Sequence, residues 1–196
     1  MKRALDVVLA LAGIAVLAAP GLLVALVIVL DSRGPPLFRA LRVGRGGRAF
    51  RALKFRTMTA GVAGPAITAE RDARVTRVGR VLRRTRFDET PQLVNVLFGD
   101  MSLVGPRPED PRFVDAADAA WGRVLSVRPG ITGPTQLAFA DEEQALVGRD
   151  DPETAYRARV LPAKLRSDVA YVEGRTFAGD VALLARTLAF ALGARA

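Results

Sequence analysis

The residues from Val7 to Leu30 read VVLALAGIAVLAAPGLLVALVIVL, an apolar run of 24 residues without a charge. At about 1.5 Å per residue, a straight helix of this length would cross a hydrocarbon layer of about 30 Å. A cleaved secretory signal is a poor interpretation, because the run is longer than the apolar core of such a signal and is followed by arginines. The stretch therefore predicts a membrane segment.

The middle and the flanks of this run argue against a simple span. Pro20 removes a backbone donor and clashes with the carbonyl group of Val16. Basic residues lie on both sides of the run, which by the positive-inside rule favours both ends on the cytoplasmic face. We therefore expect residues 1–31 to form a re-entrant helix-break-helix, broken at Pro20, that enters one leaflet and returns. A kinked helix that spans the bilayer remains an alternative.

The rest of the chain, residues 32–196, predicts one small globular domain. Two apolar-rich segments, Leu37–Val43 and residues 48–55, flank a glycine-rich turn and predict a β-hairpin. Helical spacing or capping predicts helices at residues 71–84, 92–98, 115–127 and 181–192, and small residues predict a loop at 60–69. The expected fold class is α+β, mostly α: a catalytic domain with a short β-hairpin and amphipathic interfacial helices, standing on the N-terminal membrane segment.

The composition excludes several classes of enzyme. The 196 residues include no cysteine and no histidine. Zinc sites of the usual kind, disulfides, thiol nucleophiles and the Ser-His-Asp relay are therefore excluded. An enzyme with this sequence must work with carboxylates, arginine, lysine, hydroxyl groups or a hard cation held by oxygen.

The charge is segregated along the chain. The net charge is +9, and the segment from Arg39 to Arg86 holds 14 basic residues against two acidic ones. Such a segment predicts an anionic partner, which could be a nucleic acid, a lipid surface or a phosphorylated substrate. Residues 71–84 have the pattern of a basic amphipathic helix, which suits anionic headgroups but is also compatible with a solvated face.

Two adjacent acidic residues, Asp88 and Glu89, lie where the helix at 92–98 is expected to begin. One interpretation of Asp88 is an N-cap that accepts backbone hydrogen bonds. The other is a nucleophile, because the helix N-terminus and upstream arginines would lower its pKa and gather phosphate oxygens. A divalent cation would then allow attack on a phosphoryl group, with Glu89 assisting. The residues alone leave both interpretations open.

Further cations accompany this pair. Arg107 lies between Pro106 and Pro108, and such a rigid segment would aim a guanidinium group at a fixed anion. Lys54 and Arg56 end the second predicted strand and supply two more positive charges. Each signal is weak by itself, and their clustering in one chain is more informative.

These motifs together resemble the bacterial sugar transferases of the monotopic phosphoglycosyl transferase family. The matching segments follow in family order over nearly the whole chain: residues 2–6 (KRALD), 38–47, 54–58 (KFRTM), 74–79 (RVTRVG), 88–96 (DETPQLVNV), 101–108 (MSLVGPRP), 129–133 (PGITG) and 168–172. The main departure is at residues 134–142, which read PTQLAFADE where many members have an aromatic residue followed by Gln-Val-Asn-Gly-Arg.

The resemblance implies transfer of a sugar phosphate from a nucleotide sugar, usually a UDP-sugar, to polyprenyl phosphate, with release of the nucleoside monophosphate. It also implies Mg²⁺ and a catalytic domain on the cytoplasmic face of the bacterial inner membrane, in contact with the phospholipid bilayer. The resemblance implies that Asp88 is the nucleophile and a metal contact and that Glu89 is its catalytic partner. It places Pro106, Arg107 and Pro108 at the nucleotide diphosphate and Lys54, Arg56 and Arg83 at phosphates or headgroups. Supporting residues would be Asp168, near the basic helix, and Arg128.

Two other functions remain to be weighed. One is a membrane-tethered nucleic-acid-binding protein that uses the basic region between Arg39 and Arg86, although the chain has no recognisable nucleic-acid-binding motif. The other is a structural protein of the membrane surface. We expect the transferase, with no nucleic-acid partner. The transferred sugar is left open by the sequence, and so is the formation of a homodimer.

Overall fold

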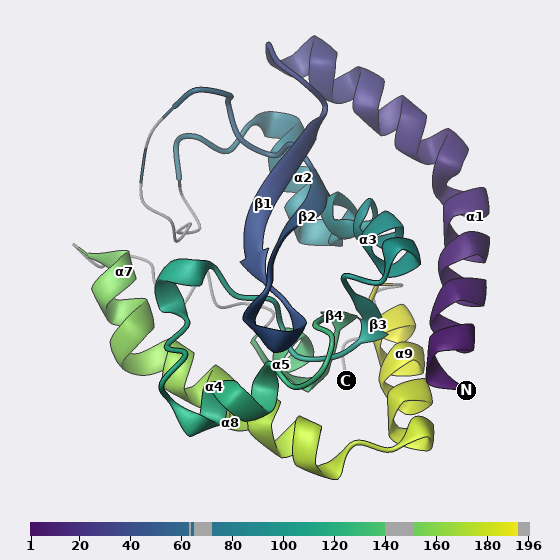
Figure 1. The fold of residues 1–196 in the computed structure, drawn as a ribbon. Helices are drawn as coiled ribbons and strands as arrows, with labels where there is room; N and C mark the ends of the chain where they lie inside the picture. Colours follow the sequence, from purple (N-terminus) through teal and green to yellow (C-terminus); the bar gives the residue numbers. More distant parts are fainter. Residues whose placement is uncertain (63, 65–71, 140–150, 192–196) are drawn as a thin grey trace.

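The computed structural model describes residues 1–62, 64, 72–139 and 151–191. Its first element, α1 (Lys2–Asp31), is a helix of 30 residues that lies along the outside of the domain (Figure 1). The chain stays helical through Pro20, so the predicted interruption of the helix at this residue is wrong. Figure 1 shows instead a bend between two helical arms that do not fold back on each other. A proline inside a helix lacks one hydrogen bond and crowds the preceding turn, which bends a helix that its neighbours otherwise keep intact.

One side of α1 packs against the domain. Asp6, Ala10 and Ile28 are buried, and a Cβ atom added to Gly13 would lie 3.0 Å from the side chain of Leu93, so the helices approach closely there. The other side is apolar and exposed, with Val8, Leu11, Val16, Leu22, Leu23, Leu26 and Leu30. By length and composition α1 could cross a membrane.

The predicted β-hairpin is confirmed. Strands β1 (Leu37–Val43) and β2 (Ala49–Phe55) pair in antiparallel fashion, with Leu37 opposite Phe55. The connection contains a 3₁₀ turn, η1 (Arg45–Gly47), in which Gly46 and Gly47 have φ values of 69° and 75°. Glycine adopts this left-handed conformation without steric cost, which explains the glycine-rich turn.

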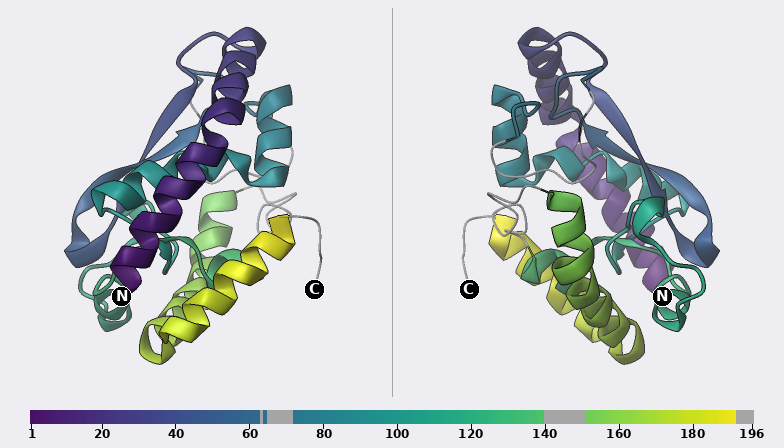
Figure 2. Two further views of the ribbon diagram at one scale, coloured as in Figure 1. Left: turned by 90° about the vertical axis from the view of Figure 1, so that its right-hand side faces the viewer. Right: turned by 90° about the vertical axis from the view of Figure 1, so that its left-hand side faces the viewer.

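Helices α2 (Arg77–Thr85) and α3 (Gln92–Phe98) lie between the hairpin and α1 (Figures 1 and 2). The end predicted for α3 is confirmed, because Gly99 closes it with φ 90°. The start predicted for α2, at residue 71, is wrong. Thr76 caps the helix through a hydrogen bond from the Gly79 amide, and Val75 before it pairs with Met58 in a β-bridge. The predicted loop at 60–69 lies mostly outside the described residues.

A short parallel sheet in the centre of the domain was not predicted. Strand β3 (Ser102–Val104) pairs with β4 (Gly130–Thr132), and both have only three residues. A Cβ atom on Gly130 would lie 2.1 Å from the Gly105 amide nitrogen, so no larger residue fits. Such short segments have too few residues to show a strand periodicity.

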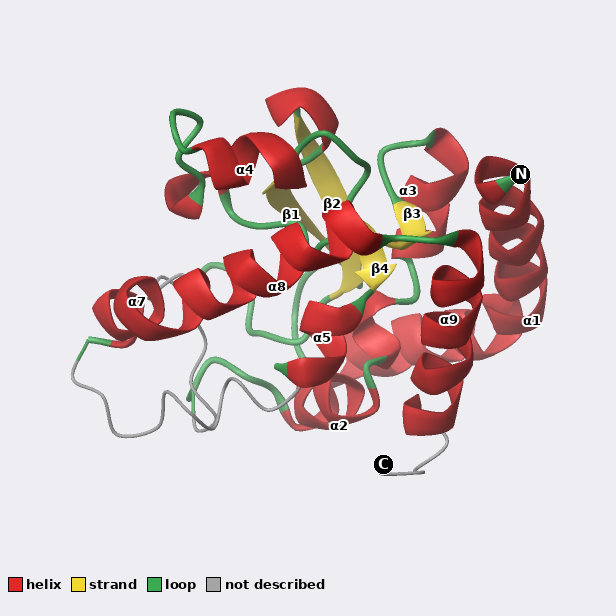
Figure 3. Cartoon of the chain, turned by 90° about the horizontal axis from the view of Figure 1, so that it is seen from below, coloured by secondary structure: helices red, strands yellow, loops and turns green. Residues whose placement is uncertain are grey.

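The C-terminal third is helical (Figure 3). It comprises α4 (Ala119–Val124), α5 (Pro134–Ala138), α7 (Pro152–Ala155), the π-helical segment η4 (Tyr156–Val160), α8 (Leu161–Gly174) and α9 (Phe177–Ala191). The helix predicted at 115–127 is shorter, since Asp118 caps it before Ala119, and α8 was not predicted. The helix predicted at 181–192 begins earlier, at Phe177, and Asp180 does not cap it; Asp180 is buried and accepts hydrogen bonds from Lys2 and Tyr171.

Candidate active site

Asp88 lies in a tight turn between α2 and α3. Helix α2 ends at Thr85, and its C-terminal capping residue Arg86, with a φ of 57°, is the only non-glycine residue with positive φ in the described ranges. The 3₁₀ turn η2 (Phe87–Glu89) follows, and the ring of Phe87 stacks on Phe55 of β2 at 6.0 Å. The left-handed backbone conformation of Arg86 and the stacked ring of Phe87 fix the path of the chain after α2, and so the positions of Asp88 and Glu89.

The Asp88 side chain is free of hydrogen bonds to any residue that the structure describes. Asp88 is 8% exposed, and α3 begins four residues later with Pro91 as its capping residue. The N-cap interpretation of Asp88 is therefore wrong. The Asp88 oxygen atoms are not among the fully enclosed polar atoms without a partner in the described part of the chain, so the carboxyl group remains accessible to a ligand.

Burial raises the pKa of Asp88 to about 6, and the negative charge of Glu89 acts in the same direction. The sequence predicted a net lowering of this pKa by nearby cations, and that prediction is wrong. Lys54, Arg83 and Arg86 do act to lower it, but the loss of solvation outweighs them. Asp88 therefore titrates within a pH range that enzymes use.

Glu89 behaves in the opposite way. Its Oε1 atom accepts a hydrogen bond of 2.6 Å from Nζ of Lys54. Burial alone would raise the pKa of Glu89, but the charges of Lys54 and Arg107 and this hydrogen bond lower it to about 2. Two neighbouring carboxyl groups whose pKa values are pushed apart are typical of residues with distinct catalytic roles.

A pocket of about 280 Å³, including the part open to solvent, is lined by Glu89 and not by Asp88. It brings together three cationic side chains, one carboxylate and two amides. The lining residues are Arg42, Ala52, Lys54, Glu89, Gln92, Arg107, Pro108, Gly130, Ile131 and Gln136. An excess of positive charge in a partly enclosed cavity suits a phosphate or diphosphate group.

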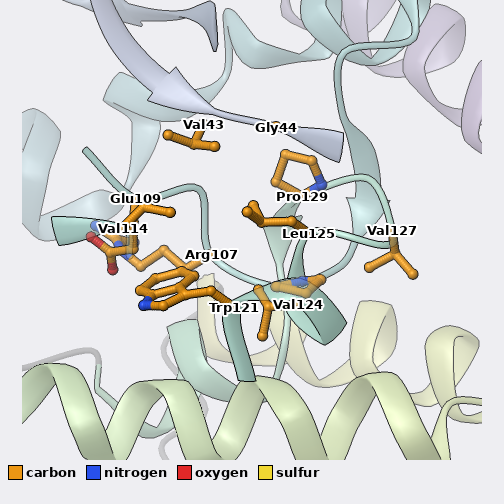
Figure 4. Close-up of a pocket in the computed structure, with 11 residues that line it drawn as sticks. Val43, Gly44, Arg107, Glu109, Val114, Trp121, Val124, Leu125, Val127 and Pro129 are labelled. Carbon is orange, nitrogen blue, oxygen red and sulfur yellow. The ribbon is translucent and has the colours of Figure 1, made fainter. Parts of the chain in front are cut away.

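Arg107 reaches this pocket from the loop at residues 105–109, which follows β3. The Gly105 amide donates to the Thr132 carbonyl at 2.9 Å, and Pro106 is fully buried. A second pocket, of about 250 Å³ and largely apolar, lies on the other side of the loop. Figure 4 shows Arg107, Glu109 and Trp121 gathered at one end of that pocket and Pro129 and Val127 at the other. These contacts hold the loop in place, and the aiming of Arg107 at a fixed anion stays a prediction.

Arg56 and Arg83 do not line the charged pocket. The guanidinium group of Arg56 is buried and donates to the carbonyl groups that follow α1, among them Ser32 at 2.8 Å and Arg33 at 2.7 Å. Arg56 thus stabilises the end of α1, and its geometry does not support the phosphate contact expected of it. Arg83 donates through Nε to Thr57 Oγ1 at 3.0 Å and acts on Asp88 through its charge.

The two supporting residues hold backbone segments. Asp168 was expected near the basic helix, and this is wrong. Its carboxyl group accepts a hydrogen bond of 2.6 Å from Thr135 Oγ1, and burial raises its pKa to about 7. Arg128 donates through Nε to the Gly99 carbonyl at 2.7 Å, at the end of α3.

A magnesium ion fits this site only in part. The described residues contain no group of three or more acidic side chains that could enclose a metal. Glu89 is already engaged by Lys54, which leaves Asp88 as the free carboxylate. Mg²⁺ is commonly bound by one or two carboxylates together with substrate phosphates and water. The donor set therefore fits an ion that arrives with a diphosphate.

Several site residues were missed by sequence reasoning. Arg42, Gln92 and Gln136 line the charged pocket, and Arg86 acts on the pKa of both acidic residues. Gln136 donates to the carbonyl groups of Gly105 and Gly130, while its Oε1 atom is buried without a partner among the described residues. Gln136 lies within the stretch at residues 134–142 that departs from the family pattern, so the resemblance did not select it. The remainder of that stretch, residues 140–142, is outside the described residues.

Comparison with known proteins shows the family to which the chain belongs. The sequence profile described as bacterial sugar transferase matches residues 1–194, so the chain belongs to the bacterial sugar transferase family. One relative is the UDP-glucose:undecaprenyl-phosphate glucose-1-phosphate transferase of Caulobacter vibrioides, 42% identical over 192 residues, which cover 95% of this chain and 68% of the relative. The family membership confirms the resemblance and decides against the nucleic-acid-binding and structural alternatives.

Two further relatives differ in length. The UDP-N-acetylgalactosamine-undecaprenyl-phosphate N-acetylgalactosaminephosphotransferase of Aeromonas hydrophila is 42% identical over 160 residues, which cover 76% of this chain and 38% of the relative. The exopolysaccharide production protein PSS of Rhizobium leguminosarum is 37% identical over 203 residues, which cover 96% of this chain and 93% of the relative. The Caulobacter and Aeromonas relatives are named for the transfer of different sugars.

Proposed function

We propose that this protein transfers a sugar-1-phosphate from a UDP-sugar to undecaprenyl phosphate or a similar polyprenyl phosphate, an early membrane step of polysaccharide synthesis, through a covalent intermediate on Asp88. The names of the Caulobacter and Aeromonas relatives support the donor and acceptor classes. The observation that carries the proposal for the chemistry is the buried Asp88 carboxyl group, which has no partner among the described residues, beside a cationic pocket.

The transfer has two balanced steps. In the first, an Asp88 carboxylate oxygen forms a bond with the β-phosphorus of the donor, and the bond from that phosphorus to the bridging oxygen breaks. The nucleoside monophosphate leaves with the electron pair of that bond. In the second, a phosphate oxygen of the lipid acceptor attacks the same phosphorus and releases Asp88. The products are the nucleoside monophosphate and a polyprenyl diphosphate sugar.

The charged pocket supplies the electrostatic part of this chemistry. Lys54 and Arg107 lie where they would neutralise the diphosphate, which otherwise repels the attacking carboxylate. Glu89, with its lowered pKa, stays ionised and holds Lys54 in place. A bound Mg²⁺, for which Asp88 and the diphosphate would provide oxygen ligands, would supply further charge neutralisation.

The attachment of α1 supports a re-entrant arrangement in the cytoplasmic leaflet of the inner membrane. Near its start, Asp6 accepts hydrogen bonds from Ser102 Oγ at 2.9 Å and the Leu103 amide at 3.1 Å. At its end, Arg56 binds the carbonyl groups of residues 32–35. Both ends are therefore tied to one domain, and a span would require that domain to lie on both sides of the bilayer.

The absence of cysteine makes this topology directly testable. We expect single cysteines placed by Ala4→Cys and Asp31→Cys both to react with a membrane-impermeant maleimide in inverted vesicles and not in intact spheroplasts. Val16→Cys is the matched control, because Val16 lies on the exposed apolar side of α1, which the lipid would cover. This cysteine should react neither in inverted vesicles nor in spheroplasts. Reaction of only one terminal cysteine from each side would establish a span.

The reaction itself is tested with a panel of nucleotide sugars. The full chain in phospholipid nanodiscs, with Mg²⁺ and undecaprenyl phosphate, should release nucleoside monophosphate in an acceptor-dependent manner from at least one UDP-sugar. No release from any donor in the panel would contradict the proposed function. The same panel identifies the sugar.

The pKa of Asp88 predicts a pH dependence. Because the ionised form attacks, kcat/KM for the donor should fall about tenfold per pH unit below about pH 6 and level off above it. Lys54 lowers the pKa of Asp88 and Glu89 raises it, so Lys54→Met should move the acid limb to higher pH and Glu89→Gln to lower pH. A limb that stays in place in both variants would show that another group titrates.

A further inference from the structure

A buried polar cluster lies behind the 105–109 loop and takes no part in the chemistry described above. Its members are Glu109, Tyr156 and Lys164, which we call the Glu109 cluster. The Tyr156 hydroxyl donates to Glu109 Oε1 at 2.8 Å, and Nζ of Lys164 donates to the Tyr156 oxygen at 3.0 Å. Nζ of Lys164 also lies 3.4 Å from Glu109 Oε1. The side chains of Lys164 and Glu109 are 3% and 11% exposed, and Tyr156 is 1% exposed.

The helical residues of the cluster come from an unusual segment. Tyr156 opens the π-helical segment η4, and Lys164 follows in α8. The ring of Phe113 packs on Tyr156 with centroids 4.9 Å apart, and the Lys164 ammonium lies 4.9 Å from the Tyr156 ring centre. Short π-helical segments often occur at functional sites, where they change the direction of one side chain. Here the segment begins with the tyrosine that binds Glu109.

The cluster fixes the loop that carries Arg107. Glu109 follows Arg107 by two residues, and its carbonyl group accepts a hydrogen bond of 3.0 Å from the Val43 amide at the end of β1. On the other side of Arg107, the Gly105 amide donates to the Thr132 carbonyl at 2.9 Å. Arg107 thus lies between two anchored positions of the loop, and Figure 4 shows it beside Glu109.

Burying an ammonium group and a carboxylate together contributes little to stability, because the desolvation cost offsets much of their attraction. The desolvation cost of the Glu109 cluster is therefore better explained by a role in positioning the 105–109 loop. A displacement of about 1 Å at a group that binds the reacting phosphate can lower a rate about 100-fold. The charge of Arg107 also acts on Glu89, so its position affects both the donor and the catalytic pair.

We propose that Glu109, Tyr156 and Lys164 are positioning residues that hold the Arg107 guanidinium group against the diphosphate of the donor. This inference rests on the proposed function for the identity of the ligand. The cluster acts through the loop and touches no reacting atom. Its loss would leave the fold in place and let Arg107 move.

The two tyrosines of the chain provide a matched pair for the test. Tyr171 in α8 also donates to a carboxylate, that of Asp180 at 2.7 Å, and its hydroxyl lies 3.4 Å from the Val104 carbonyl in β3, so it contacts the strand before the loop and not the Glu109 cluster. We expect Tyr156→Phe to weaken UDP binding by the full chain in nanodiscs about tenfold, measured by calorimetry, and Tyr171→Phe to change it less than twofold. In an Arg107→Ala background, Tyr156→Phe should have no further effect on UDP binding, whereas a purely structural role predicts additive losses.

A measurement without ligand separates this inference from the proposed function. Amide hydrogen exchange in the peptide that covers residues 105–109 should become faster in Tyr156→Phe and remain as in the wild type in Tyr171→Phe. This difference is expected even if the two substitutions lower the melting temperature equally. Unchanged exchange, or equal losses of UDP affinity in the two variants, would overturn the positioning role while leaving the function intact. Failure of the wild type to bind UDP would overturn the proposed donor and the ligand assigned to Arg107.

Discussion

Asp88→Asn is expected to reduce kcat for sugar-phosphate transfer by at least about 10³-fold, because the amide that replaces the carboxylate is too weak a nucleophile to form the bond to phosphorus. The substitution preserves the shape of the side chain. The carboxyl group makes no hydrogen bond to the described residues that the amide would lose, so thermal stability should be unchanged. The loss of activity would then be chemical in origin.

The measurement is a single turnover with a donor labelled in its β-phosphate and no acceptor. The wild type should release one equivalent of nucleoside monophosphate and retain the label on the protein, and Asp88→Asn should do neither. Asp115→Asn is the control, since Asp115 is exposed and accepts a backbone hydrogen bond from Ala117 that asparagine can also accept. Normal turnover by Asp88→Asn, or label retained by it, would contradict the covalent mechanism.

Arg107→Ala is expected to lower kcat/KM for the donor about 100-fold, because a bidentate guanidinium–phosphate contact in a partly desolvated pocket is lost. The effect should appear in kcat as well as in KM if the contact strengthens as the diphosphate bond breaks. The charge of Arg107 also lowers the pKa of Glu89, so the variant should reduce the difference between the pKa values of Asp88 and Glu89.

Arg112→Ala is the matched control for this variant. Arg112 is five positions further along the chain, its side chain is 55% exposed, and it pairs with Asp110. Surface pairs of this kind contribute little, so the control should keep kcat/KM within about twofold of the wild type. Equal losses in the two variants would show that general positive charge, rather than the aimed guanidinium group, determines donor use.

The sequence predicted the site better than it predicted the roles within it. The pair Asp88 and Glu89 and the cations Lys54 and Arg107 were all singled out, and the structure brings them together. Arg56 has the same residue type and lies two positions from Lys54, yet it binds carbonyl groups at the end of α1. Residue type and spacing do not distinguish a cation that binds substrate from one that binds backbone, since both provide the same donors.

Local sequence by itself determined the apolar helix, the hairpin with its glycine turn and the end of α3 at Gly99. These features depend on interactions within a few residues: periodicity, the φ angles open to glycine and the geometry of proline. Proline geometry also predicts a disturbance at Pro20, but only packing against α2 and α3 decided that the helix bends there without breaking.

Only the tertiary structure decided the state of Asp88, the partners of Asp168 and the attachment of both ends of α1 to one domain. Each depends on groups far apart in the chain, such as Asp6 with Ser102 and Asp168 with Thr135. The direction of the Asp88 pKa shift is the clearest case: neighbouring arginines are visible in the sequence, but the water removed around the carboxyl group is not. Solvation is a property of the assembled fold, and here it outweighs the charges that the sequence displays.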